Sequence, residues 1–289
     1  MNSAPQLRTL LVLGRVSNLP TVWSNCLAGW WLGGGGNYWK LPFLLVGVSL
    51  LYTGGMFLND AFDADFDRQR RPERPVPSGK ISAPLVWRYG FGQLVTGIFL
   101  ILFCGQLAAG AAFFLAVFIL LYNFSHKFFT ASPWLMGACR FWVYVIAGAA
   151  GARGLNGWPI YGGAALGLYV VGLSYVARRE SFRAAVPHWP LLLLAAPIIL
   201  SLLMNVGGAR LAAIGLSLLL ALWIFYCVRT VFFGGELNVG YIVSNLLAGI
   251  VLVDWLAVAP LNPHWLGVPL LLLALFGGTL WLQKFVPAT

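Results

Sequence analysis

The chain carries little charge. Of its 289 residues only 9% are charged, whereas 60% are hydrophobic. A soluble protein of this length needs far more charge on its surface, so a soluble globular domain is excluded. Most apolar side chains must therefore face lipid or other helices, which indicates an integral membrane protein.

Cysteine is also scarce. Cys26, Cys104, Cys139 and Cys227 stand singly in apolar stretches, with neither metal-ligand spacing nor a disulfide pattern. We expect them to be small buried hydrophobic residues. Long polar stretches are missing too, apart from residues 59–83, which are too few for a separate domain. The chain is therefore expected to form a single membrane domain over residues 1–289.

Long apolar runs take the place of charge. A helix needs about 20 apolar residues to cross a bilayer, and helices follow because backbone groups find no water partners in lipid. The sequence therefore predicts an all-α, polytopic transmembrane bundle of nine to ten spans. The candidate spans are 15–34, 41–58, 84–105, 108–124, 134–153, 158–177, 190–206, 210–228, 238–258 and 265–284.

The basic residues fall mostly on one side of these spans. With ten spans and a cytoplasmic N-terminus, 15 of the 18 Lys and Arg residues are cytoplasmic, and only Lys40, Arg153 and Arg210 lie outside. Both termini, the loop 59–83 and a second cap loop at 178–189 are then cytoplasmic, in a bacterial inner membrane. The net charge of +10 is explained by topology, so we expect no nucleic-acid partner.

The few acidic residues are clustered. Five of the eight lie within residues 60–73, and four aspartates within eight residues repel one another unless a divalent cation binds. If the second span continues as a helix, Asp60, Asp63 and Asp67 share one face, with Asn59 beside them. Such hard oxygen ligands suit Mg²⁺, which shares its coordination sphere with substrate phosphates.

Cations follow these carboxylates directly, and arginine binds phosphate oxygens in bidentate fashion. They are Arg68, Arg70, Arg71, Arg74 and Lys80. The segment therefore predicts a magnesium–diphosphate site. A solvated loop of mixed charge is the alternative, and an EF-hand is excluded because its glycine and closing glutamate are absent.

The pattern Asn59-Asp60-x-x-Asp63-x-x-x-Asp67, followed by Arg74-Pro75-Val76-Pro77-Ser78-Gly79, resembles the first aspartate-rich motif of the UbiA superfamily of intramembrane prenyltransferases. The resemblance continues in the same order over about residues 8–258. Its further elements are Arg15 to Thr21, Tyr122 to Lys127 with Arg140 nearby, and Asn238-Val239-Gly240.

The resemblance implies a helical bundle around a central cavity and Mg²⁺-dependent transfer of a prenyl group from a prenyl diphosphate to a lipophilic or aromatic acceptor within the membrane. The resemblance also implies that Asp60, Asp63 and Asp67 are catalytic residues that bind the metal. Metal and cations would neutralise the leaving diphosphate, and aromatic rings could steady an allylic cation. The residues expected at the diphosphate are Asn59, Arg15, Arg68, Arg74, Lys127, Arg140, Arg178 and Arg179.

The chain departs from the family where a second aspartate-rich motif usually stands. Residues 174–183 contain no aspartate, and Glu180 is the sole acid, beside Arg178 and Arg179. These arginines could bind diphosphate in place of a second metal, or they could be topology signals. The segment resembles the EboC-like branch of the family. A terpene cyclase of the same architecture and a non-catalytic isoprenoid-binding member are the alternative functions.

Two other polar residues stand near span ends. His126 is expected to be an ordinary loop histidine, with a general base or a phosphate contact as the alternative. Asp254 lies within the ninth span, and we expect it to be close enough to the outer surface to stay hydrated.

Overall fold

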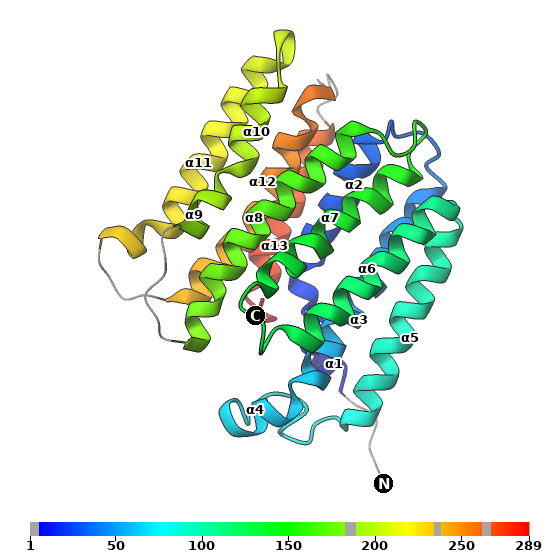
Figure 1. Ribbon diagram of the computed structural model, residues 1–289, viewed down its shortest axis with the longest axis vertical. Coiled ribbons are helices and arrows are strands. Elements are labelled where there is room, and N and C mark those ends of the chain that lie inside the picture. Colours follow the sequence, from blue (N-terminus) through cyan, green and yellow to red (C-terminus); the bar gives the residue numbers. More distant parts are fainter. Residues whose placement is uncertain (1–5, 183–188, 234–237, 262–266, 289) are drawn as a thin grey trace.

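The computed structural model describes residues 6–182, 189–233, 238–261 and 267–288, and all regular structure within these ranges is helical. The long helices run side by side as one bundle (Figure 1). In chain order they are α1 (Leu7–Leu13), η1 (Val16–Asn18), α2 (Leu19–Leu32), α3 (Lys40–Phe62), α4 (Ala64–Arg70), α5 (Ala83–Leu102), α6 (Gln106–Ser125), α7 (Ser132–Ala150), α8 (Gly157–Phe182), α9 (Trp189–Leu194), α10 (Ala196–Met204), η2 (Gly207–Ala209), α11 (Arg210–Phe233), α12 (Val239–Val258), η3 (Ala259–Leu261) and α13 (Gly267–Leu282).

Within the described residues, most of each predicted apolar run is helical, so the all-α class is confirmed. Six of the described helices are long and apolar enough to cross a membrane. The others include α2, α9, α10 and α13, which have 14, 6, 9 and 16 residues. Pro197 explains the break in the run 190–206, because a proline fits the first turn of α10 but not the middle of a helix.

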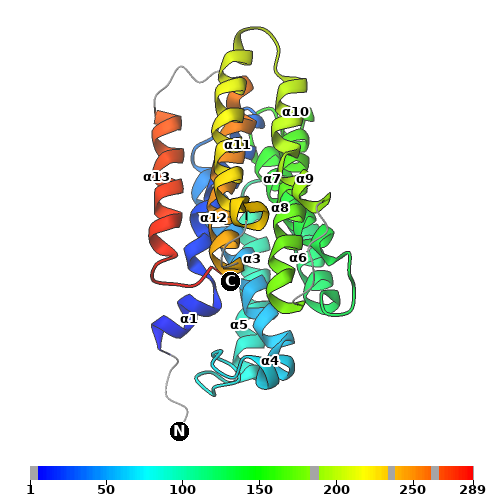
Figure 2. The same cartoon turned by 90° about the vertical axis from the view of Figure 1, so that its left-hand side faces the viewer.

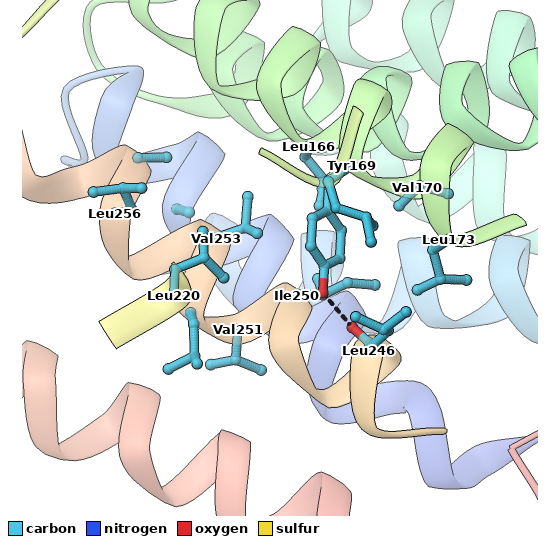
Figure 3. Close-up of a cluster of buried hydrophobic side chains, with 14 of the residues drawn as sticks. Leu166, Tyr169, Val170, Leu173, Leu220, Leu246, Ile250, Val251, Val253 and Leu256 are labelled. Carbon is cyan, nitrogen blue, oxygen red and sulfur yellow. Dashed lines mark hydrogen bonds between the residues drawn. The ribbon is translucent and has the colours of Figure 1, made fainter. Parts of the chain in front are cut away.

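Two large hydrophobic cores hold the described bundle together, and a smaller third one packs around Leu13, Phe57 and Val86 near α4. One large core joins α2, α3, α5, α6 and α7, and the other joins α8, α11 and α12 with parts of α2, α7 and α13. Figure 3 shows the second core, in which the Tyr169 hydroxyl donates a 2.8 Å hydrogen bond to the Leu246 carbonyl. The bond satisfies the polar end of a buried ring and ties α8 to α12.

The end of α3 sets the position of the aspartate segment. Asp63 follows the last residue of α3 in a helical conformation, and its N–H donates to the Asn59 carbonyl at 2.9 Å. The Asp67 N–H donates to the Asp63 carbonyl at 2.8 Å, so the helical hydrogen-bond pattern continues into α4. In Figures 1 and 2, α4 lies at one end of the bundle, below α3.

The expected second cap loop, 178–189, is not a loop throughout. Residues 178–182 continue α8, and Trp189 begins α9. Residues 183–188 lie outside the described part of the chain.

Candidate active site

A chamber of about 420 Å³ opens among α2, α3, α6, α7, α8 and α12, at the end of the bundle where α4 lies. One part of its wall is polar and one part is apolar. The polar part includes Arg15, Asn59, Asp63, Asp67, Arg71, Arg74, His126 and Lys127. The apolar part includes Val22, Val48, Leu115, Ile119, Val143, Val243, Leu247 and Ile250.

Three of the four aspartates in this segment are buried on one side of the α3–α4 junction. Asp60, Asp63 and Asp67 are 7%, 8% and 2% exposed, whereas 91% of the Asp65 side chain is exposed. The spacing i, i+3, i+7 places the three on a common face because the helical path hardly breaks at Asp63. The shared face predicted from the sequence is therefore present.

Cations from separate elements pair with these carboxylates. Arg74 lies 2.9 Å from Asp67 and 3.6 Å from Asp60. Arg15, which precedes η1, lies 3.6 Å from Asp60 and donates to Asn59 Oδ1 at 3.2 Å. The Asn59 amide in turn donates to Asn123 of α6 at 3.1 Å. The segment is thus fixed both to the turn between α1 and η1 and to α6.

Asp63 is held by the end of α6. Lys127 Nζ lies 2.9 Å from its carboxylate and also donates to the Phe62 carbonyl at 2.9 Å. His126 Nε2 lies 3.2 Å from the same oxygen, so His126 is a chamber residue and the expectation of an ordinary loop histidine is wrong. Burial raises the pKa of Asp63, but His126 and Lys127 outweigh burial and hold that pKa below its usual value.

The donor set fits magnesium. The described residues contain no preassembled group of three His, Cys, Asp or Glu side chains at metal-binding distance. Mg²⁺ does not need one, since it binds through one or two carboxylates together with water and substrate phosphates. Asp60 Oδ1 is buried and has no hydrogen-bond partner among the described residues, only the two ion pairs at 3.6 Å. A buried carboxylate oxygen without a hydrogen-bond donor is suited to bind a metal cation.

Comparison with known proteins identifies the family. The sequence pattern of the UbiA prenyltransferase family matches residues 18–259. The chain belongs to this family. A digeranylgeranylglyceryl phosphate synthase of Sulfolobus acidocaldarius is 33% identical over 87 residues, which are 30% of this chain and 30% of that protein. A synthase of the same name from Methanopyrus kandleri is 25% identical over 206 residues, covering 56% and 75% of the two chains.

Solved UbiA structures have the same fold. A UbiA homolog from Aeropyrum pernix has a TM-score of 0.65 at 16% identity, covering 84% of this chain and 96% of its own. A homolog from Archaeoglobus fulgidus bound to DMAPP and Mg²⁺ has a TM-score of 0.61 at 17% identity, covering 86% and 99%. The matched segments span 30% and 39% of the lengths of the Sulfolobus and Methanococcoides relatives, so sequence likeness to them is partial.

Two of the arginines that the UbiA resemblance suggested have other partners. Arg68 pairs with Asp65 on the exposed side of α4, and it is not among the residues that line the chamber. Arg178 lines the chamber, and its guanidinium donates to the backbone carbonyls of His126, Phe129 and Thr130. The side chains of Arg179 and Glu180 lie outside the described part of the chain.

Arg140 and Asp254 lie deeper in the UbiA bundle. Arg140 lines the chamber, and its guanidinium donates to Asn25 and Thr21 of α2. Asp254 is completely buried, so the expectation that it stays hydrated is wrong. The error arose because α2 and α7, which cover Asp254, are more than 100 residues away in the sequence.

Sequence reasoning also missed Tyr52, whose ring lies in the chamber wall under Arg140. Tyr52 stands seven residues before Asn59, which is two helical turns along the same face of α3. That spacing was the signal that could have identified it. Asn18, which lies within the element Arg15 to Thr21, donates to the Tyr52 hydroxyl at 3.3 Å.

Proposed function

We propose that the protein is a Mg²⁺-dependent prenyltransferase that moves a prenyl group from a prenyl diphosphate to a lipophilic or aromatic acceptor within the membrane. The observation that carries the proposal is that the buried Asp63 and Asp67 line the polar end of an otherwise apolar chamber together with several cations. The buried Asp60 lies directly behind them, 3.6 Å from Arg15 and Arg74. The digeranylgeranylglyceryl phosphate synthases among the relatives, and the DMAPP, GPP and Mg²⁺ bound in solved homologs, support the same reaction class.

The proposed roles follow from the contacts. Asp60, Asp63 and Asp67 would hold Mg²⁺, which supplies Lewis-acid stabilisation of the leaving diphosphate. Arg15, Arg74 and Lys127 already offset carboxylate charge at this end of the chamber. We propose that the same three side chains bind diphosphate oxygens. Asn59 keeps Arg15 oriented through its side-chain oxygen.

The apolar part of the chamber would hold the prenyl chain. The diphosphate leaves with the electron pair of the C–O bond, and an allylic cation forms beside walls that exclude water. Aromatic faces, including those of Tyr52 and Tyr122, line the chamber and can interact favourably with that cation. The nucleophilic atom of the acceptor then forms the new bond and gives up its proton.

The α8 end of the site is proposed to act through arginine. Arg178 anchors the turn that carries Lys127, because it bonds three carbonyls between residues 126 and 130. We propose that Arg178 and Arg179 face diphosphate on the side where the family usually has a second aspartate motif, and that fewer metal ions bind there. Assignment to the EboC-like branch stays a prediction.

The proposed setting is a bacterial inner membrane, with nine to ten spans and a cytoplasmic N-terminus. The asymmetry of Lys and Arg supports this orientation. It would place the aspartates at the cytoplasmic end of the chamber, where a water-soluble head group can enter while the prenyl chain lies in the bundle. Membrane lipid is then the immediate surroundings of the acceptor.

The test is incubation of the purified protein with labelled prenyl diphosphates of several lengths, with and without Mg²⁺ and candidate acceptors. The proposal expects Mg²⁺-dependent release of diphosphate together with a prenylated acceptor. A hydrocarbon product formed without acceptor would instead identify a terpene cyclase. Binding without any turnover would favour a non-catalytic isoprenoid-binding protein.

A further inference from the structure

A buried carboxylate lies behind the wall of the chamber. Asp254 Oδ2 accepts hydrogen bonds from Ser24 at 2.5 Å and from Asn25 Nδ2 at 2.7 Å, and Oδ1 accepts from the Tyr144 hydroxyl at 2.5 Å. All four residues are fully buried. Asp254 is not among the residues that line the chamber, and its carboxylate is occupied by these three donors.

Asn25 connects this carboxylate to the chamber. Its amide nitrogen donates to Asp254, and its amide oxygen accepts from Arg140 Nη1 at 2.6 Å. Arg140 Nη2 donates to Thr21 at 3.2 Å, and the guanidinium lies 5.6 Å from the centre of the Tyr52 ring. The relay Asp254–Asn25–Arg140 therefore holds a buried cation on the chamber wall in one orientation.

The helices around the relay Asp254–Asn25–Arg140 are closely packed. A Cβ added at Gly162 would lie 2.7 Å from the Tyr144 ring, and one added at Gly163 would lie 3.0 Å from Tyr144 Cβ. These glycines let α8 press on the ring whose hydroxyl binds Asp254. Charges buried at membrane depth are costly, and replacing such a pair by apolar residues is often neutral or stabilising. A structural role alone gives a weak reason to keep them.

The position of the cation indicates its ligand. Tyr52 precedes Asn59 by seven residues, so Arg140 contacts α3 about 10 Å deeper than the diphosphate end. Within the proposed prenyl transfer, on which this inference rests, that depth lies past the head group of the prenyl donor. We propose that Asp254 is a positioning residue that, through Asn25, fixes Arg140 to bind an oxyanion, a carboxylate or a phosphate, on the acceptor.

Equilibrium binding to purified protein in nanodiscs tests this inference without requiring turnover. The probes are two matched pairs: 4-hydroxybenzoate with its methyl ester, and a prenylated glyceryl phosphate with the corresponding alcohol. The wild-type protein should bind the anion of one pair at least about tenfold more tightly than its uncharged partner. The pair that shows the preference identifies whether carboxylate or phosphate is the group bound.

Two variants should reduce that preference to about twofold or less: Asp254→Asn, and Asn25→Leu, which keeps both charges but breaks the relay. The matched control is Tyr144→Phe, which removes a hydrogen bond from Oδ1 and leaves the Oδ2 relay intact. It should retain the wild-type preference. In an Arg140→Gln protein, the additional substitution Asp254→Asn should cause no further loss of the preference for the anion, because the two residues act as one unit.

Three results would overturn the inference. The first is a wild-type protein that binds neither anion more tightly than its uncharged partner. The second is an Asp254→Asn variant that binds both members of a pair more weakly by the same factor. The third is a double variant in which the losses of anion preference caused by Asp254→Asn and Arg140→Gln add. Affinity for geranyl diphosphate with Mg²⁺ should be unchanged in Asp254→Asn. A wild-type protein without Mg²⁺-dependent affinity for geranyl diphosphate would instead refute the proposed function. The failure of the inference and the failure of the proposed function are therefore distinguishable.

Discussion

Arg74 and Arg68 show at the residue scale how burial separates two neighbouring arginines. Arg74 pairs at 2.9 Å with an Asp67 carboxylate that is almost fully buried, whereas Arg68 pairs with an Asp65 that projects away from the bundle. When a cation that pairs with a buried carboxylate is removed, no water is at hand to solvate the carboxylate. A cation facing an exposed carboxylate is screened by solvent.

Arg74→Gln should therefore destabilise the protein by roughly 3–5 kcal/mol, because Asp67 is left as an uncompensated buried charge. It should also weaken prenyl diphosphate binding. Arg68→Gln, the matched control, should cost about 0–1 kcal/mol and leave binding unchanged. Thermal unfolding in detergent and equilibrium binding measure the two effects. Equal effects of both substitutions would contradict the distinction.

Sequence spacing located the aspartates but not every partner. The positions of Asp60, Asp63 and Asp67 on one face follow from local helical geometry, which the sequence encodes directly. The burial of Asp254 depends instead on Ser24 and Tyr144, which come from helices far away in the chain. Tertiary packing of that kind has no local signature, so the burial of Asp254 cannot be predicted from the spacing of nearby residues.

At the scale of the elements, close contact between α7 and α8 depends on small residues. A Cβ at Gly137 would lie 2.6 Å from the Gly167 carbonyl oxygen, a distance that real contacts do not reach. Glycine lets two helix backbones approach, which is how helices in membranes pack tightly. This pair of helices carries Arg140 and Arg178, so its spacing also sets the shape of the chamber.

Gly137→Ala should accordingly lower stability by about 1–3 kcal/mol, as expected for overpacking. Gly110→Ala on α6 is the control, since an added Cβ there meets open space within 4 Å. It should be neutral or slightly stabilising, because alanine favours a helix more than glycine does. The measurement is the midpoint of thermal unfolding for both variants. A Gly137→Ala protein as stable as the wild type would show that the helices can separate without cost.

The apolar runs predicted the helices well, because a membrane leaves few other structures open to the backbone. Their boundaries were less predictable. The run 190–206 is split by Pro197, and the second cap loop begins inside α8, where polar residues 178–182 stay helical. Polarity alone thus did not mark the end of a helix.

For the whole molecule, the proposed orientation makes a direct prediction. A reporter fused after Thr289 should be cytoplasmic, because ten spans with a cytoplasmic N-terminus return the chain to the same side. In the proposed topology, α13, which has 16 residues, is the last of these spans. Paired cytoplasmic and periplasmic reporters measure the location. A periplasmic signal would remove one span from the proposed count.

The proposed function depends on the three buried aspartates, which are proposed to bind the prenyl diphosphate through Mg²⁺. The most direct measurement is the affinity of geranyl diphosphate as a function of Mg²⁺ concentration, for wild type, Asp63→Asn and the exposed control Asp65→Asn. We predict tight, Mg²⁺-dependent binding by wild type and Asp65→Asn, and loss of the Mg²⁺ dependence in a folded Asp63→Asn protein. Unchanged Mg²⁺ dependence in Asp63→Asn would contradict it.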